Sequence, residues 1–213
     1  MMVRRRIHRY PGKRRVAGTA AVELALILPL LIMLALPIAD FARAIQASMI
    51  LINLSREGAN LASRGSQSLK VAGQSIMGSL AATAPPLDMN RDGMMYITRI
   101  IGQKDAGGAV REVILEHYRW DDRVNDAGWN RSAYAPASAV WRCGAWAGDG
   151  ACLDLPDPAT AAGVNVMSNR LADGEVITVV ESFYRFRLLF GGLDVGLGAT
   201  PAFGPDLYAM TIF

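Results

Sequence analysis

Apolar positions divide the chain into one continuous N-terminal run and several shorter segments. Between Thr19 and Asp40, Glu23 is the one charged residue in the run. About 20 helical residues, each rising about 1.5 Å, cover the roughly 30 Å hydrocarbon core of a bilayer. The run therefore predicts a transmembrane helix over residues 19–40.

The helical pattern continues past this span. Four further apolar residues recur at spacings of four, four and three, on one helix face: Phe41, Ile45, Met49 and Ile52. Gly65 is a typical helix stop. We therefore expect a helix extension over residues 41–64, as part of one long helix from about residue 20 to residue 63, with kinks at Pro29 and Pro37.

Residues 65–213 have the pattern of a small α+β domain. Residues 67–82 predict a second helix, which Pro85-Pro86 ends. Apolar and β-branched segments predict strands at 94–101, 110–120, 176–190 and 207–213. The first two strands are close enough to form an antiparallel hairpin. Residues 121–165, rich in Gly, Ala, Pro and Asp, predict an elaborated loop region.

Charge is distributed unevenly about the apolar run. Seven of the 22 Lys and Arg residues lie in residues 1–18, which contain no acid, leaving 15 basic against 19 acidic residues elsewhere. Under the positive-inside rule, residues 1–18 form a basic cytoplasmic leader and residues 65–213 an extracytoplasmic domain. Because the excess is confined to the N-terminus, a uniformly basic nucleic-acid-binding protein is excluded. A mean hydropathy of +0.21 also makes the chain too apolar for a disordered tail.

A cleavable secretory signal is the first alternative for this N-terminus, because it also has a basic start and an apolar middle. Its apolar region usually runs about 7–15 residues and ends at a small-x-small site. Here the run is longer, and Pro37-Ile38-Ala39 matches such a site poorly. A single-pass inner-membrane protein with a cytoplasmic N-terminus is the simpler interpretation.

Glu23 is the unusual residue of the span, since an unpaired carboxylate inside a membrane is costly. Its position alone leaves open a functional role or a side chain that reaches the interfacial water. The basic leader, Gly18 and Thr19-Ala20-Ala21-Val22-Glu23 resemble the class III signal of type IV pilin-like proteins. That resemblance implies prepilin-peptidase cleavage after Gly18, a mature N-terminus at Thr19 and an assembly role for Glu23. The aromatic first residue usual in that family is absent.

The longer segment from Arg14 to Leu31 resembles the opening of TadE/TadG-like pseudopilins of tight-adherence pili, and Val176–Phe190 is similar to their late strand. This resemblance implies a pilin-like α+β fold: a long N-terminal transmembrane helix followed by a small extracytoplasmic antiparallel β-sheet domain. It also implies a minor pilin or pseudopilin. Its partners would be the prepilin peptidase, other pilins and pseudopilins, the pilus assembly platform and the lipid bilayer.

The two cysteines of the chain, Cys143 and Cys152, lie in the loop region with eight residues between them. Outside the inner membrane, such a pair favours a disulfide. A redox catalyst would use Cys-x-x-Cys, which is absent. We therefore expect a structural disulfide.

Residues 88–93 match the first half of a calcium-binding loop, with candidate oxygen ligands at Asp88, Asn90 and Asp92. The position that should hold a bidentate Glu is Arg99. A polar turn is therefore the favoured interpretation, and no cofactor is expected. Calcium would bind only if a distant carboxylate completed the site.

Two histidines, His8 and His117, are too few for a multi-histidine zinc site. The sequence also lacks a G-x-S-x-G elbow, a Walker A loop and a dinucleotide-binding glycine motif. We expect no enzyme. His117 is more typical of packing, as are the aromatic residues near it: Tyr118, Trp120, Trp129, Tyr134, Trp141 and Trp146.

Two alternatives to the pseudopilin stay open. One is an uncleaved single-pass membrane-anchored binding module, whose contact surface would be the calcium-like turn or the aromatic cluster. The other is a membrane-tethered hydrolase that uses His117. Survival of the basic leader in the mature protein would favour the binding module over the pseudopilin. A cleft beside His117 would favour the hydrolase.

Overall fold

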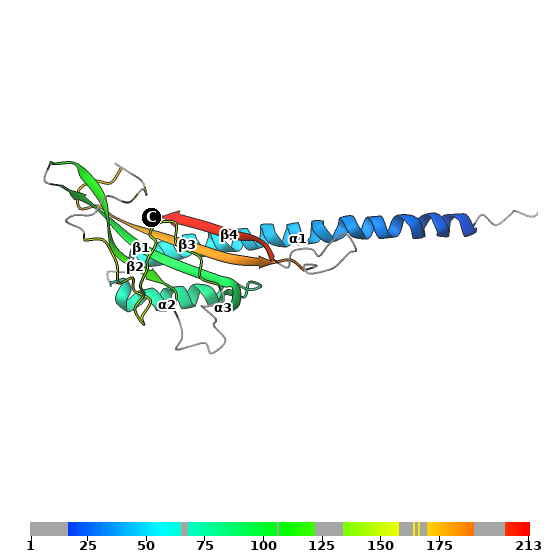
Figure 1. The fold of residues 1–213 in the computed structure, drawn as a ribbon, viewed down its shortest axis with the longest axis horizontal. Helices are drawn as coiled ribbons and strands as arrows, with labels where there is room; N and C mark the ends of the chain where they lie inside the picture. Colours follow the sequence, from blue (N-terminus) through cyan, green and yellow to red (C-terminus); the bar gives the residue numbers. More distant parts are fainter. Residues whose placement is uncertain are drawn as a thin grey trace, which may run out of the picture. The chain divides into compact units, whose positions relative to one another are not determined.

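The computed structural model describes residues 17–64, 68–105, 107–121, 134–157, 164, 166, 170–189 and 203–213 (Figure 1). They form three helices and four strands, and the chain divides between Phe41 and Ala42 into two compact units. The class is α+β, as the sequence predicts.

The first helix, α1 (Ala17–Arg64), has 48 residues and contains both Pro29 and Pro37. Its observed bounds confirm the long helix that the hydrophobic pattern predicts. Within the described residues it is the one helix long and apolar enough to cross a membrane, with a mean hydropathy of 2.5 in its most apolar window. None of that window is buried within the chain, so its apolar surface is available to a bilayer or to other helices.

Residues of α1 beyond Phe41 belong to the second unit and contribute to its core through Ala47, Leu51, Leu54, Ala59 and Ala62. Ile45, Met49 and Ile52, which belong to the apolar series noted in the sequence, are exposed. That series therefore lies on the face of α1 that points away from the core. Small residues allow a close approach of the buried face. A Cβ added to Gly58 would lie 2.8 Å from Leu80 Cδ1 and 3.1 Å from Val180 Cγ1.

The second unit is built on a four-stranded antiparallel sheet in the order β2-β1-β3-β4. The strands are β1 (Gly93–Lys104), β2 (Val110–Arg119), β3 (Val176–Arg187) and β4 (Phe203–Ile212). The predicted β1–β2 hairpin is confirmed. Strand β4 begins four residues before its predicted start, because an edge strand tolerates a proline such as Pro205 without losing an interior ladder bond.

Two helices pack on one face of this sheet. Val180 of β3 lies under Gly58 of α1, and the hydroxyls of Thr211 and Ser55 are 3.2 Å apart. Helix α2 (Leu69–Ala82) lies over β2, where the Gln74 amide donates to the carbonyl of Arg119 at 2.8 Å. The short helix α3 (Met89–Asp92) leads directly into β1.

A loop covers the opposite sheet face. This loop includes residues 134–157 of the predicted loop region. Among these described residues, the strand-like pairing is limited to isolated bridges. The Tyr96 hydroxyl donates to the carbonyl of Pro136, and the Ser138 hydroxyl donates to Glu181. The sheet is therefore buried on both faces, which explains why β3 reads as an almost continuous apolar run.

Candidate processing segment and polar clusters of the domain

The predicted cleavage position lies at the beginning of α1. Gly18 is exposed, and an added Cβ there would meet no atom within 4 Å. The basic residues up to position 16 lie outside the described residues, as does the side chain of Thr19. The geometry thus places Gly18 on an accessible helix end, and its processing stays a prediction.

Glu23 lies one to two turns into the same helix and is exposed. Its neighbours Val22, Leu24 and Leu26 are exposed as well. An apolar helix surface of this length is not stable in water, and a carboxylate on it must find a partner once the helix enters a low-dielectric environment. The structure thus places Glu23 on the exposed apolar part of α1, and its role in assembly stays a prediction.

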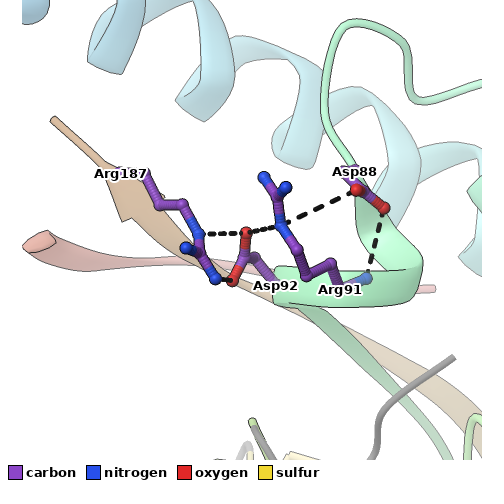
Figure 2. Close-up of polar contacts among 4 residues, drawn as sticks. All are labelled: Asp88, Arg91, Asp92 and Arg187. Atoms are coloured by element: carbon purple, nitrogen blue, oxygen red, sulfur yellow. Dashed lines mark hydrogen bonds and ion pairs between the residues drawn. The ribbon is translucent and has the colours of Figure 1, made fainter. Parts of the chain in front are cut away.

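The calcium-like segment folds as a helix cap followed by an ion pair. Asp88 is the N-cap of α3, and its Oδ1 accepts the backbone N–H of Arg91 at 3.2 Å. The side chain of Asp92 is 1% exposed and receives Arg187 Nε at 2.6 Å and Nη2 at 2.7 Å. Arg91 Nε donates to the same carboxylate at 2.8 Å (Figure 2).

These contacts decide the charge state of Asp92. Burial acts to raise the pKa of its carboxyl, but the hydrogen bonds and charges of Arg187 and Arg91 outweigh it and hold the pKa below 3.8. An ionised carboxylate whose two oxygens both bind guanidinium groups is poorly placed to coordinate calcium. The arrangement supports the polar turn rather than a metal site formed by Asp88, Asn90 and Asp92.

A cavity of about 180 Å³ adjoins this ion pair. It is bounded by residues of α1, of the segment from Pro86 to Arg91, and of the end of β3. Three arginines line it: Arg43, Arg91 and Arg187. Sequence reasoning missed this cluster because a register shift between Arg185 and Arg187 breaks the strand alternation there.

His117 is part of an aromatic stack inside the domain. Its ring is 1% exposed, lies 5.6 Å from the Tyr96 ring with an interplanar angle of 7°, and lies 5.3 Å from the Trp146 ring. Its Nδ1 is 2.7 Å from Thr98 Oγ1. Burial lowers the pKa of His117 to about 4, although the charge of Asp154 acts in the opposite direction. A neutral, enclosed imidazole does not form the cleft that the hydrolase alternative requires.

The other aromatic residues are mostly interior as well. Tyr118, Trp120 and Tyr134 are buried, whereas Trp141 and Trp146 are half-buried, and Trp129 lies outside the described residues. The Arg119 guanidinium stacks over Trp146 at 4.8 Å. The described members therefore anchor the loop to the sheet rather than forming an open platform.

Glu181 is a buried carboxylate that the sequence reasoning did not single out. It is fully buried in the middle of β3 and accepts hydrogen bonds from the Ser138 hydroxyl, from Ala139 N–H at 2.8 Å and from the Tyr208 hydroxyl at 3.0 Å. These bonds fasten the loop to β3 and β4. A lone Glu within the apolar run Val176–Phe183 was the available signal.

Cys143 and Cys152 are joined by a disulfide, with their Cα atoms 5.9 Å apart. The bridge closes a short segment of the loop, next to the Gly144 N–H that donates to Asp154 Oδ2 at 2.7 Å. It lies beside the backbone pairing of Cys152 N–H with the carbonyl of His117 at 2.9 Å. The bridge thus holds the loop close to the buried aromatic stack.

A protein-family model matches the N-terminal part of the chain. The family model described as TadE-like protein matches residues 18–60, which include Gly18, Glu23, the apolar span and most of the remaining part of α1. Neither the curated proteins nor the solved structures yielded a match. Residues 18–60 are thus similar to TadE-like proteins, which confirms the resemblance found in this part of the sequence.

Proposed function

We propose that this chain is a minor pilin, or pseudopilin, of a tight-adherence pilus, and that a prepilin peptidase matures it by cutting between Gly18 and Thr19. The observation that carries the proposal is that the TadE-like match begins at Gly18 and includes Glu23 and the apolar span. A membrane anchor of unrelated origin would need the apolar span but not its combination with Gly18 and Glu23.

The exposed apolar part of α1 supports an assembly role. Its side chains are unburied within the chain, so they lie in the bilayer before assembly and against other helices afterwards. In such a helix bundle, Glu23 pairs with the α-amino group that cleavage creates at Thr19 of a neighbouring chain. The pairing compensates both charges and fixes the register, because a slipped neighbour leaves two charges unpaired.

The extracytoplasmic domain supports a structural role rather than an enzymatic one. His117 is enclosed by Tyr96 and Trp146, and Asp92 is engaged by two arginines. The major subunit of such a pilus is expected to be short and helical. A chain with a domain of this size is therefore better suited to be a minor component. Its partners in this proposal are the peptidase, the other pilins and pseudopilins, the assembly platform and the bilayer.

The N-terminus of the membrane-extracted protein tests the proposal. Mass spectrometry should find a chain beginning at Thr19 when the prepilin peptidase is present, and an intact leader when it is absent. Gly18→Val should block cleavage, whereas the leader variant Gly12→Val serves as the matched control and should be cut normally. An intact leader in both strains contradicts the proposal.

One alternative has its own support. Residues 42–213 form a compact unit with a buried core, which is what an anchored binding module requires. An uncleaved leader in cells that have an active peptidase would favour this alternative, because Glu23 would then have no freed amino group of Thr19 to pair with.

A further inference from the structure

The disulfide of the chain has a carboxylate in contact with both of its sulfur atoms. Asp154 Oδ1 lies 2.8 Å from Cys143 Sγ and 2.9 Å from Cys152 Sγ. A disulfide sulfur carries no hydrogen, so neither contact is a hydrogen bond that would hold the carboxylate there. The two contacts instead place a negative charge against the atoms at which a thiol would react.

The backbone of the loop holds Asp154 in this position. Its other carboxylate oxygen, Oδ2, accepts the Gly144 N–H at 2.7 Å, and the Leu153 N–H donates to the carbonyl of Ala145 at 2.8 Å. Gly144 also permits the close approach, because a Cβ added there would lie 2.9 Å from Asp154 Oδ2. The loop around Cys143, rather than the sulfur atoms themselves, therefore positions the carboxylate.

Asp154 forms no ion pair in the part of the chain that the structure describes. The ion pairs found there use other carboxylates, and Arg142, the nearest basic residue in the sequence, is exposed. The negative charge of Asp154 acts as far as the ring of His117, whose protonated form it favours. Because a carboxylate is ionised at neutral pH, the two sulfurs face a negative charge that no neighbouring cation neutralises.

Thiol–disulfide exchange would place further negative charge on these sulfurs. Cys143 is half-buried and more accessible than Cys152, which is 7% exposed. A reagent thiolate attacks Cys143 Sγ and forms a new S–S bond, while the old bond breaks and its electron pair leaves on Cys152 Sγ, which then takes a proton from water. A second reagent thiolate attacks the reagent sulfur of the mixed disulfide and releases Cys143. Two reagent thiols are thereby oxidised to a disulfide, and the bridge is reduced to two thiols.

We propose that Asp154 protects the Cys143–Cys152 bridge against thiol–disulfide exchange by electrostatic repulsion. The attacking and leaving sulfurs are both anionic, and the leaving charge develops 2.9 Å from the carboxylate. The bridge therefore exchanges slowly with the thiols of other chains, and the loop stays fastened over the sheet. The proposal does not depend on the proposed function, because it involves only residues 143–154.

Rates of bridge opening in the full chain, in mild detergent, test the proposal. The bridge is opened at low ionic strength, where screening is weak, with neutral 2-mercaptoethanol, cationic cysteamine or anionic 2-mercaptoethanesulfonate. Opened chains are counted by mass after alkylation, and each rate is divided by the thiolate concentration. Asp154→Asn should react with 2-mercaptoethanol about tenfold faster than the unmodified chain, which is the effect of a unit charge about 3 Å away in water.

The ratio of the cysteamine rate to the sulfonate rate isolates the effect of charge. It is compared with the same ratio for hydroxyethyl disulfide, a neutral small molecule. In the unmodified chain the ratio should be about threefold higher or more, because Asp154 attracts the ammonium group and repels the sulfonate. Asp154→Asn and added salt should each remove this preference, whereas Asp154→Glu should keep it.

Asp149→Asn is the matched control. Asp149 is an exposed carboxylate of the same loop, and its contacts in the described structure include the Ala151 N–H at 3.1 Å but neither sulfur. This variant should open at the rate of the unmodified chain and keep the preference for cysteamine.

Three results would overturn the proposal. One is an unmodified chain that shows no more preference for cysteamine than hydroxyethyl disulfide does, a result that needs no variant to fold. A second is an Asp154→Asn chain that reacts faster with all three reagents but keeps the preference, which would limit Asp154 to anchoring Gly144. The third is an equal loss of preference in Asp149→Asn, which would assign the effect to the overall charge of the loop.

Discussion

The Arg187 guanidinium holds the buried carboxylate of Asp92 through two hydrogen bonds, at 2.6 Å from Nε and 2.7 Å from Nη2. The two residues are 95 positions apart, so the pair fastens α3 to the end of β3. Removing one member of such a pair leaves the other charge poorly compensated, which is more damaging than losing an exposed ion pair.

Arg187→Gln should therefore destabilise the domain by about 1–3 kcal/mol, the usual range for hydrogen bonds to a charged group. Arg91→Gln is the matched control and should cost less than about 1 kcal/mol, because its side chain is more exposed and Asp92 keeps both bonds to Arg187. Denaturant unfolding of the full chain in mild detergent can be followed by tryptophan fluorescence, since all four tryptophans lie between residues 120 and 146. Equal losses in both variants would contradict this ranking.

The same pair predicts an acid limit. Because the pKa of folded Asp92 lies below 3.8, the pair contributes its full stability above that value and loses it as the pH falls further towards the folded pKa. Asp92→Asn should be less stable than the unmodified chain at pH 7. The difference between the two chains should shrink as the pH is lowered below about 4.

His117 gives a second pH dependence, in a higher window. Its pKa is about 4 in the folded chain against 6.5 for an ordinary histidine. The unfolded chain therefore binds the extra proton first. The stability is complete above pH 6.5 and falls between pH 6.5 and about 4, by up to about 3 kcal/mol. His117→Phe keeps a ring between Tyr96 and Trp146 but does not titrate, so its stability should change less across this window. Parallel curves for both chains would show that His117 is not the responsible group.

The Cys143–Cys152 bridge should stabilise the loop mainly through the unfolded chain. Closing a loop of this length corresponds to about 2–3 kcal/mol in the loop-entropy account. We expect a Cys143→Ser, Cys152→Ser double variant to lose about that amount. The unmodified protein should take up no alkylating reagent unless a reductant is added. Uptake of two alkyl groups without reductant would mean that the bridge does not form in the cell.

The sequence was sufficient for the elements but not for the arrangement of their polar residues. Periodicity located α1, α2 and the hairpin, because each has a long apolar pattern. It could not pair Asp92 with Arg187, since that contact depends on an irregularity at the end of β3. It also assigned no role to Glu181, because only the folded loop shows that Ser138 and Ala139 satisfy its charge. The resemblance to TadE/TadG-like proteins was most specific in the N-terminal helix, and the family match lies in that helix as well.

Glu23 is the residue on which the assembly proposal depends most directly. An isolated carboxylate in a low-dielectric helix bundle is strongly penalised, and pairing with the freed amino group of Thr19 in a neighbouring chain removes that penalty. Glu23→Ala removes the partner of that amino group without making the span less apolar. We therefore expect the variant to insert in the membrane at normal levels and to be missing from sheared pili by immunoblot.

Glu57→Ala is the matched control for this experiment, because Glu57 is an exposed carboxylate of the same helix beyond the apolar span. It should be incorporated like the unmodified chain, since an exposed carboxylate remains hydrated whether or not the pilus forms. Leader cleavage is measured in both variants, so that a processing defect is not mistaken for an assembly defect. Normal incorporation of a correctly cleaved Glu23→Ala chain would show that the charge pair is dispensable, and the register of the assembled helices would then have to be set by side-chain packing alone.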